Sequence, residues 1–448
     1  MPDEGGLRSQ IVSSRWVIVG AGSAGSVVAA RMSEDEDRDV VLVEAGPDLI
    51  AGDVPPEIDG PSFLAATDLA DRNDSIVAAR VTGGASSPYR RGAGIGGSSA
   101  VNAMVALRGD PSVYDAWGWA DADAAWAACA IPVQAPHDDE LGPVDRALLA
   151  ADPFAVRAPL TRSDGRRVTA AEAYLWPALG RPNLRVRANT SIDHIVVDGR
   201  RSLGVVTADG EHIAADRVVV AAGAIRSPWL LLRSGLDTPG IGEHLQDHPS
   251  APMTLALRAG CGGDVDGLVI GAIRQHDGIQ FLPMNHLGAA TPELGVLLVA
   301  LMTPTSASGT VRVGSDGEPL VDFALLDEPD DLDALAAGVE SAIERLRSPA
   351  FDEVVETVFV DGFGTTLDSL GGRDAIRRWL PGAVGDYVHA SSTCRMGAVV
   401  DADGSLFGYE GISVCDASVF PHIPDVNTHL PTTMLAERLC ARWRRRTA

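Results

Sequence analysis

The stretch from residue 16 to residue 25 reads Trp-Val-Ile-Val-Gly-Ala-Gly-Ser-Ala-Gly, and this stretch decides the fold. An apolar, β-branched run that ends at glycines is typical of a strand buried on both faces. The small residues from 24 to 32 favour a helix, and the apolar run from 39 to 44 predicts a second buried strand. The first 46 residues therefore predict a βαβ unit and a parallel sheet.

The glycines of this stretch follow the pattern G-x-G-x-x-G. Gly20 permits the tight turn, Gly22 lets the backbone approach a pyrophosphate, and Gly25 lets helix and strand pack closely. Glu44 follows Gly20 at the distance where a carboxylate accepts hydrogen bonds from an adenosine ribose, which disfavours NADP but leaves FAD and NAD open. We expect the dinucleotide site to contain Gly20, Gly22, Ser23, Ala24, Gly25, Glu44 and Ala45.

The charge and cysteine content exclude several classes of function. With 61 acidic and 36 basic residues, the net charge of -25 repels nucleic acid and anionic membrane surfaces. The five cysteines are scattered without a C-x-x-C pair, which argues against a zinc site or a disulfide framework, and we predict no metal. The acidic N-terminus is unlike a signal peptide, and the apolar runs are too short for a membrane anchor, so we expect a cytoplasmic protein.

The remaining pattern predicts two domains. Strand-like runs between 183 and 223 form a meander that returns to the first sheet, whereas residues 250–380 contain further strand candidates and an amphipathic helix over 331–346. We predict an α/β fold with a Rossmann-like nucleotide-binding domain of residues 1–115, 181–250 and 381–448. An inserted α+β substrate-binding domain of residues 116–180 and 251–380, built on an antiparallel sheet, completes it.

Residues 92–102 read Gly-Ala-Gly-Ile-Gly-Gly-Ser-Ser-Ala-Val-Asn, and here the chain resembles the glucose-methanol-choline (GMC) family of FAD oxidoreductases. Ala93 departs from the family's usual basic residue or Asn. A loop without large side chains lets a flat cofactor reach backbone N–H groups. Val101 stands where some relatives carry a histidine bonded to the flavin, so the resemblance implies non-covalent FAD. The cofactor residues that it adds here are Gly94, Gly97, Ser98 and Asn102.

The family's second signature is similar to residues 223–236, with Asp237 where glycine is usual, and residues 242–249 are also family-like. The resemblance implies a helix and loop that close over the cofactor. We place Ile192 and Gly223 in the cofactor site. His248, next to a proline, is expected to be a structural hydrogen-bonding residue.

Residues 387–397 resemble the family's H-x-x-G-T-C-x-M-G segment, with Ser392 in place of the glycine. Residues 416–421 and 427–431 resemble its C-terminal flavin segment. The resemblance assigns His389 as the catalytic histidine and Asn427 to a position that is His or Asn in relatives. It assigns to the cofactor Asp416, Ala417 and Thr428.

Oxidation of an alcohol by a flavin requires the hydroxyl proton to leave while hydride passes to flavin N5. An imidazole suits the role of base near neutral pH, so we expect His389 to take this proton. An amide hydrogen bond from Asn427 stabilises alkoxide character on the substrate oxygen. His422 and His429 lie in the same segment, and His429 is either a second histidine of the pocket or a surface residue, of which we favour the surface. The helix opened by Pro431 would favour negative charge on the reduced ring.

The leading hypothesis is an FAD-dependent dehydrogenase that acts on CH–OH groups and passes electrons to an acceptor other than oxygen. The alternatives are an oxygen-using alcohol oxidase, a lyase or decarboxylase of the same fold, and a flavin-binding module without turnover. An aromatic content of 5% argues against choline-type chemistry. The chain is short, trimmed between 117 and 164, and resembles GMC dehydrogenases associated with mycofactocin. The substrate is then a small-molecule alcohol or a reduced redox cofactor.

Overall fold

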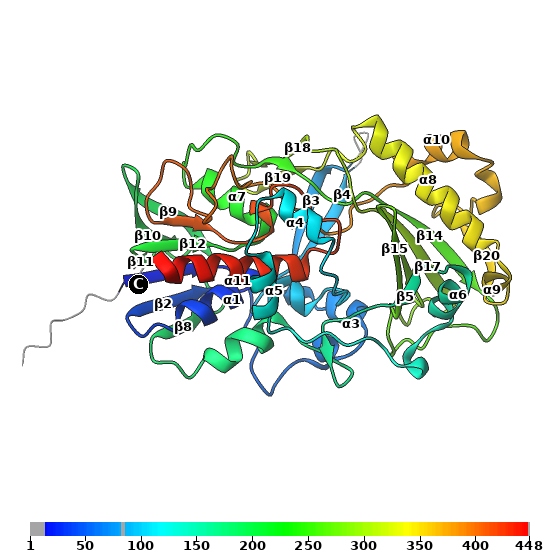
Figure 1. The fold of residues 1–448 in the computed structure, drawn as a ribbon, viewed down its shortest axis with the longest axis horizontal. Helices are drawn as coiled ribbons and strands as arrows, with labels where there is room; N and C mark the ends of the chain where they lie inside the picture. The colour runs from blue at the N-terminus through cyan, green and yellow to red at the C-terminus, as the bar shows by residue number, and fades with distance from the viewer. Residues whose placement is uncertain (1–13, 82–85, 447–448) are drawn as a thin grey trace, which may run out of the picture.

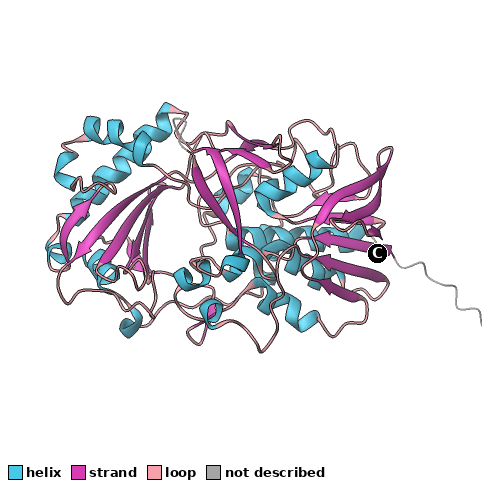
Figure 2. Ribbon diagram, turned by 180° about the vertical axis from the view of Figure 1, so that it is seen from behind, coloured by secondary structure: helices cyan, strands magenta, loops and turns pink. Residues whose placement is uncertain are grey.

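The computed structural model describes residues 14–81 and 86–446. A parallel sheet with its helices occupies one end of the molecule, and an antiparallel sheet covered by helices occupies the other (Figures 1 and 2). The prediction that the chain does not begin with a signal peptide concerns the first 13 residues, which lie outside the described residues. None of the helices in the described part combines the length and apolar character needed to cross a bilayer.

The parallel sheet confirms the predicted βαβ unit. Its strands lie in the order β21 (Ile412–Val414), β12 (Arg217–Val220), β1 (Ser14–Val19), β2 (Arg38–Val43) and β8 (Leu184–Arg187). Helix α1 (Ser23–Met32) packs against α11 (His429–Arg446), so the sheet is covered and its central strands are buried. Burial on both faces explains why these strands are apolar runs rather than alternating patterns.

The predicted meander forms a separate small sheet of β9 (Ile192–Asp198), β10 (Arg201–Thr207) and β11 (His212–Ala214). The helix that follows, α7 (Gly223–Arg233), has Pro228 in its interior rather than at its start. Proline cannot donate to the carbonyl four residues earlier, that of Ala224. The Thr393 hydroxyl donates to this carbonyl instead, at 2.7 Å, so the helix continues through the proline.

The antiparallel sheet has the strand order β20 (Val355–Phe359), β14 (Ser250–Leu257), β17 (Leu294–Leu301), β16 (Ile279–Met284), β15 (Ala272–His276) and β5 (Ala155–Arg157). Alternate residues of each strand face opposite sides. On β16, Phe281 packs toward α6 (Pro143–Ala151) and α8 (Pro329–Leu346), whereas Leu282 faces the centre of the molecule. One face of the sheet thus packs against a helical core, and the other face forms a wall of a cavity.

A third sheet lies between these two and contains β13 (Glu243–Leu245), β18 (Gly309–Val313), β19 (Pro319–Asp322), β3 (Asn73–Arg80) and β4 (Ser87–Gly92). The segment of residues 47–89, whose weak hydrophobic periodicity is typical of loops, supplies β3 and the start of β4. Strands from both predicted domains meet in this sheet, and the domain boundaries stay a prediction. The other helices are α2 (Pro56–Asp59), α3 (Phe63–Thr67), α4 (Pro111–Ala116), α5 (Ala122–Ala128), α9 (Pro349–Asp352) and α10 (Arg373–Ala383).

Candidate active site

A cavity of about 1080 Å³ gathers residues from the parallel sheet, the antiparallel sheet and the sheet between them. Both predicted catalytic residues, His389 and Asn427, line it. Most predicted cofactor residues also line it, namely Gly20, Gly22, Ser23, Ala24, Glu44, Ala45, Gly97, Ser98, Asn102, Ile192, Gly223, Asp416, Ala417 and Thr428. Gly25 and Gly94 lie behind the wall; a Cβ on Gly25 would come within 1.8 Å of the Gly20 carbonyl oxygen, so its role is close packing.

The cavity end at α1 fits a diphosphate. Helix α1 begins after Gly22 without a side-chain cap and without an acidic residue in its first turn, so its free N–H groups and positive dipole end face the cavity. The loop of residues 92–102, here called the signature loop, lies close to this turn, since a Cβ on Gly97 would lie 2.6 Å from the Cα of Gly22. The residues present therefore fit the diphosphate of a bound dinucleotide.

Glu44 ties the two glycine loops together. Its Oε2 accepts from the Ala21 N–H at 2.8 Å, and its Oε1 accepts from the N–H groups of Gly46 and Gly94, each at 3.0 Å. Since Oε2 accepts only one of these three bonds, it keeps a lone pair for a ribose hydroxyl. The predicted ribose contact stays a prediction, and the structure adds a scaffold role for the same carboxylate.

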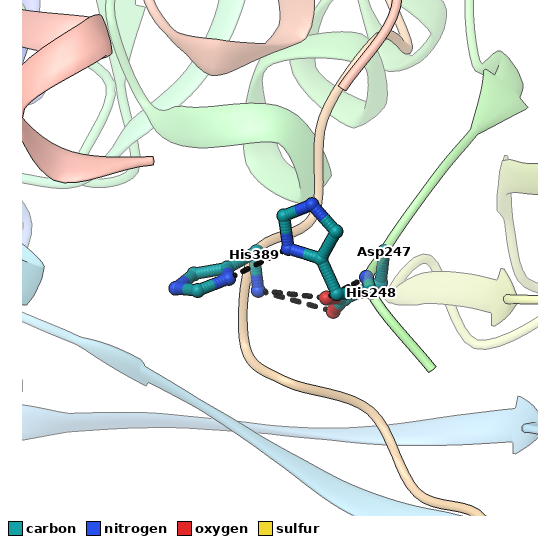
Figure 3. A group of neighbouring side chains, drawn as sticks. All are labelled: Asp247, His248 and His389. Carbon is teal, nitrogen blue, oxygen red and sulfur yellow. Dashed lines mark hydrogen bonds between the residues drawn. The ribbon is translucent and has the colours of Figure 1, made fainter. Parts of the chain in front are cut away.

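His389 lies in a buried hydrogen-bonded cluster (Figure 3). Its Nδ1 is 2.9 Å from Nδ1 of His248, and its backbone N–H donates to the Asp247 carboxylate at 3.0 Å. The ring of Tyr387 stands edge-on at 4.7 Å. Burial, with the nearby His248 and Arg91, lowers the pKa of His389 well below its usual value. The imidazole is therefore neutral near pH 7, as a general base must be.

The carboxylate and imidazole atoms of Asp247, His248 and His389 lie within 4.8 Å of one another, close enough to be considered as metal ligands. The Asp247 carboxylate, however, accepts from the backbone N–H groups of His248 and His389 and from the Tyr89 hydroxyl. The two imidazoles share a hydrogen bond through their Nδ1 atoms, and His248 Nε2 contacts the Pro424 carbonyl. These contacts describe a hydrogen-bonded network rather than an open ligand set.

Asn427 faces His389 across the cavity wall. Its Nδ2 is 3.5 Å from His389 Nε2, a long contact, and its Oδ1 accepts from Gln280 Nε2 at 3.2 Å. The two residues are 38 positions apart in sequence, and the fold brings them together as the motif predicted. An alcohol oxygen placed at this pair reaches a base and a hydrogen-bond donor at once.

The expectation that His429 lies on the surface is wrong. Its Nδ1 is 2.9 Å from the Ser23 hydroxyl, its ring lines the cavity, and burial with the nearby Arg167 lowers its pKa to about 4. The cause is the packing of α11, which His429 begins, against α1. His422 is exposed and does not line the cavity.

Several residues of the site carried no sequence signal. Arg167 is fully buried and donates to the backbone carbonyl and the side-chain oxygen of Asn102 at 2.7 and 2.9 Å; burial lowers its pKa to about 9. Gln280 contacts Asn427 from the antiparallel sheet. Asp247 lies in the family-like segment 242–249, where its position next to His248 could have identified it as a residue of the site. Arg167 and Gln280 lie outside every motif.

The residue that replaces the family glycine, Ser392, is strained. Its φ of 68° lies in the left-handed region, and its buried hydroxyl has no hydrogen-bond partner among the described residues. Ser392→Gly is expected to raise stability by about 1–2 kcal/mol, because relief of strain and of the unpaired hydroxyl exceeds the entropy cost of glycine. Thermal unfolding of the FAD-loaded protein measures this. Ser391→Gly, whose φ is ordinary, is the control and should gain less; an equal gain would contradict the strain argument.

The depressed pKa of His389 predicts a pH profile. A lowered histidine pKa favours the neutral form in the folded protein, so its contribution to stability is present above the ordinary value of 6.5 and is lost as pH falls. The same shift keeps the base unprotonated through neutrality. We expect the anaerobic rate of flavin reduction by an alcohol to stay level across pH 6.5 and to fall only well below it. A midpoint near 6.5 in stopped-flow measurements would contradict this assignment.

Comparison with protein-family models identifies the family of proteins to which this site belongs. Residues 14–130 and 151–250 match the N-terminal model described as GMC oxidoreductase, and residues 304–436 match the C-terminal model of the same description. The chain belongs to the GMC oxidoreductase family. It is accordingly an FAD enzyme that acts on CH–OH groups, and the predicted Rossmann-like domain with an α+β substrate domain is confirmed.

Individual relatives span nearly the whole chain. The chain is 30% identical to 5-(hydroxymethyl)furfural oxidase of Methylovorus sp. (strain MP688), over 95% of this chain and 97% of the relative. It is 28% identical to oxygen-dependent choline dehydrogenase of Paraburkholderia xenovorans (strain LB400), over 97% and 94%. Among solved structures, pyridoxine 4-oxidase from Mesorbium loti superposes with a TM-score of 0.84 at 25% identity, covering 96% and 99%. Relatives at this similarity therefore act on different alcohols.

Proposed function

We propose that this GMC enzyme oxidises an uncharged alcohol with an apolar body, His389 acting as the base and Asn427 as the donor to the substrate oxygen. The observation that carries the proposal is the pair His389 Nε2 and Asn427 Nδ2, which lie 3.5 Å apart on the cavity wall. When bound, non-covalent FAD supplies the hydride acceptor. The protein's own residues take the proton and hold the oxygen.

The wall beside this pair is apolar, which supports an uncharged substrate. Its members share one hydrophobic cluster with Tyr387, whose ring contacts His389. Besides Tyr387, the cavity-lining side chains of this cluster are Phe63, Ala103, Met104, Val105, Ile270, Leu282, Met284 and Leu298. Burial raises the pKa of the neighbouring Asp386 carboxyl, which weakens it as a partner for a cation. A quaternary ammonium group would have little to offset its desolvation here.

The proton path follows from the geometry. The substrate hydroxyl donates toward His389 Nε2, and the imidazole takes the proton as the carbon–hydrogen bond breaks. The Asn427 amide donates to the oxygen as its negative charge grows, in a site from which the apolar wall excludes water. The product carbonyl keeps the Asn427 contact.

Two electron acceptors are candidates. The prediction of an acceptor other than oxygen rests on the resemblance to short, mycofactocin-linked dehydrogenases, and that linkage stays a hypothesis. An oxygen-using oxidase is favoured by the names of relatives, which include oxidases and an oxygen-dependent dehydrogenase. Reoxidation of dithionite-reduced protein by air, compared with a quinone dye, separates them: fast reaction with air removes the dehydrogenase assignment.

Anaerobic bleaching of the bound flavin tests the substrate class. We expect 5-(hydroxymethyl)furfural and benzyl alcohol to bleach it faster than choline at equal concentration. Faster bleaching by choline would overturn the uncharged-substrate proposal. A flavin that no alcohol bleaches, although dithionite does, would overturn alcohol oxidation itself.

A further inference from the structure

We propose that two hydrogen-bond chains, anchored on the adjacent backbone carbonyls of Pro424 and Asp425, fix which ring nitrogen of His389 carries hydrogen and which end of the Asn427 amide faces it. His248 and Gln280 are then positioning residues. Neither side chain lines the cavity, so both act through the residues that do. The catalytic consequence rests on the proposed function; the proton positions themselves do not.

The first chain runs from Pro424 to His389. A backbone carbonyl can only accept, so the Pro424 oxygen, 3.0 Å from His248 Nε2, requires a hydrogen on that nitrogen. Burial lowers the pKa of His248 to about 3, so the ring is neutral and its Nδ1 carries the lone pair. His389 Nδ1, at 2.9 Å, must therefore donate. The lone pair of His389 is left on Nε2, the atom that faces Asn427.

The second chain runs from Asp425 to Asn427. The Asp425 carbonyl accepts from Gln275 Nε2 at 2.7 Å, which leaves Gln275 Oε1 on the other side of the amide. That oxygen accepts from Gln280 Nε2 at 2.7 Å, and the second hydrogen of the same Nε2 is directed to Asn427 Oδ1 at 3.2 Å. Asn427 therefore presents its NH₂ group to His389.

Gln280 is held in this orientation from both ends of its amide. Its Oε1 accepts from the Tyr387 hydroxyl at 2.5 Å, while both hydrogens of its Nε2 are used by Gln275 and Asn427. The side chain is fully buried, so an inverted amide would set its oxygen against the acceptor oxygens of Gln275 and Asn427 and would lose both of these bonds without water to replace them. The polarity of the chain is thus fixed by its carbonyl anchor.

The two chains end as a complementary pair. One end offers a lone pair on His389 Nε2, and the other offers a hydrogen on Asn427 Nδ2, 3.5 Å apart. A hydroxyl group both donates and accepts, so it satisfies the two ends together. Inverting either chain would present two donors or two acceptors, and an alcohol could then satisfy only one in the reactive geometry. Adjacent carbonyls in one segment set both ends.

The test of the first chain is the tautomer of His389 in the FAD-loaded protein. Nitrogen NMR of ¹⁵N-histidine-labelled protein, with His389→Gln used for assignment, should show a protonated Nδ1 and an unprotonated Nε2. In His248→Leu the Nδ1 partner is lost, and a mixture of tautomers is expected. His248→Gln retains an acceptor and a donor at the two ends of its amide and should restore the wild-type pattern. A protonated Nε2 in the wild type would overturn the chain.

Kinetics supply the second readout. His248→Leu should slow anaerobic flavin reduction severalfold, because only part of the population keeps Nε2 free, and His248→Gln should recover most of the rate. Gln280→Glu has the same shape but cannot donate to Asn427, so a loss of roughly 10²-fold is expected, as for removal of an oxyanion donor. Gln280→Leu removes the bonds without inverting them and should lose less.

The outcomes separate the two proposals. Wild-type rates in both His248→Leu and Gln280→Glu would overturn the positioning roles. A loss in Gln280→Leu equal to that in Gln280→Glu would overturn the polarity argument for the second chain. If no alcohol reduces the wild-type flavin, alcohol oxidation fails, yet the NMR result still decides whether His389 carries its hydrogen on Nδ1.

Discussion

Replacing His389 by alanine is expected to leave FAD bound and to slow alcohol-dependent flavin reduction by about 10²–10⁴-fold, the usual contribution of a positioned base. The imidazole is half-buried and neutral, and its Nε2 lies beside Asn427, so its removal takes away the proton acceptor without opening the diphosphate end of the cavity. The measurement is anaerobic stopped-flow reduction, with the flavin absorbance of the purified protein as the check on binding.

His422→Ala is the matched control for this variant. The residue lies in the neighbouring segment, is exposed, and does not line the cavity, so its loss should leave the reduction rate unchanged. If His389→Ala reduces its flavin at the wild-type rate, the base assignment is wrong. If it has lost its flavin, dithionite titration of FAD-reconstituted protein separates a binding defect from a catalytic one.

Gly97→Ala should abolish stable retention of FAD. A Cβ at this position lies 2.6 Å from the backbone of Gly22, so the turn and the signature loop must move apart at the diphosphate end. We expect a colourless protein that is destabilised by roughly 2–4 kcal/mol, since backbone strain and overpacking both act. Flavin content after gel filtration and thermal unfolding measure the two effects.

Gly199→Ala controls for backbone strain alone. Its φ of 57° is close to the 51° of Gly97, but a Cβ at Gly199 meets nothing within 4 Å. This variant should stay yellow and lose about 1 kcal/mol. Full flavin retention in Gly97→Ala would mean that the loop approach is not part of the cofactor site.

The parts of the fold that the sequence predicted well are local. Residues 16 to 44 form a strand, a helix and a strand in order, so their apolar runs and glycines are informative without distant partners. Strands β3 and β4 were missed because the segment shows weak periodicity; they pair with each other locally, but their place in the sheet is set by β19, which lies more than 200 residues from β3. Such pairing is set by the tertiary fold, not by local preference.

The same distinction holds in the site. His389 and Asn427 were found because each lies within a motif of fixed spacing. Gln280 and Arg167 were missed because their contacts to Asn427 and Asn102 are made possible only by the whole fold, and neither residue type signals chemistry on its own. His429 was misplaced because a polar residue at a helix start usually meets solvent, whereas here the start of α11 meets α1.

Strand β16 offers a practical handle for redesign of substrate range. One face of this strand carries Gln280, Leu282 and Met284, because every second residue of a strand points to the same side. The residue that orients Asn427 and two residues of the apolar wall therefore share one rigid element. Libraries that vary Leu282, Met284 and the facing Leu298, while Gln280 is kept, should yield enzymes with altered alcohol preference and intact turnover. Retaining this single glutamine is the design constraint that the sheet imposes.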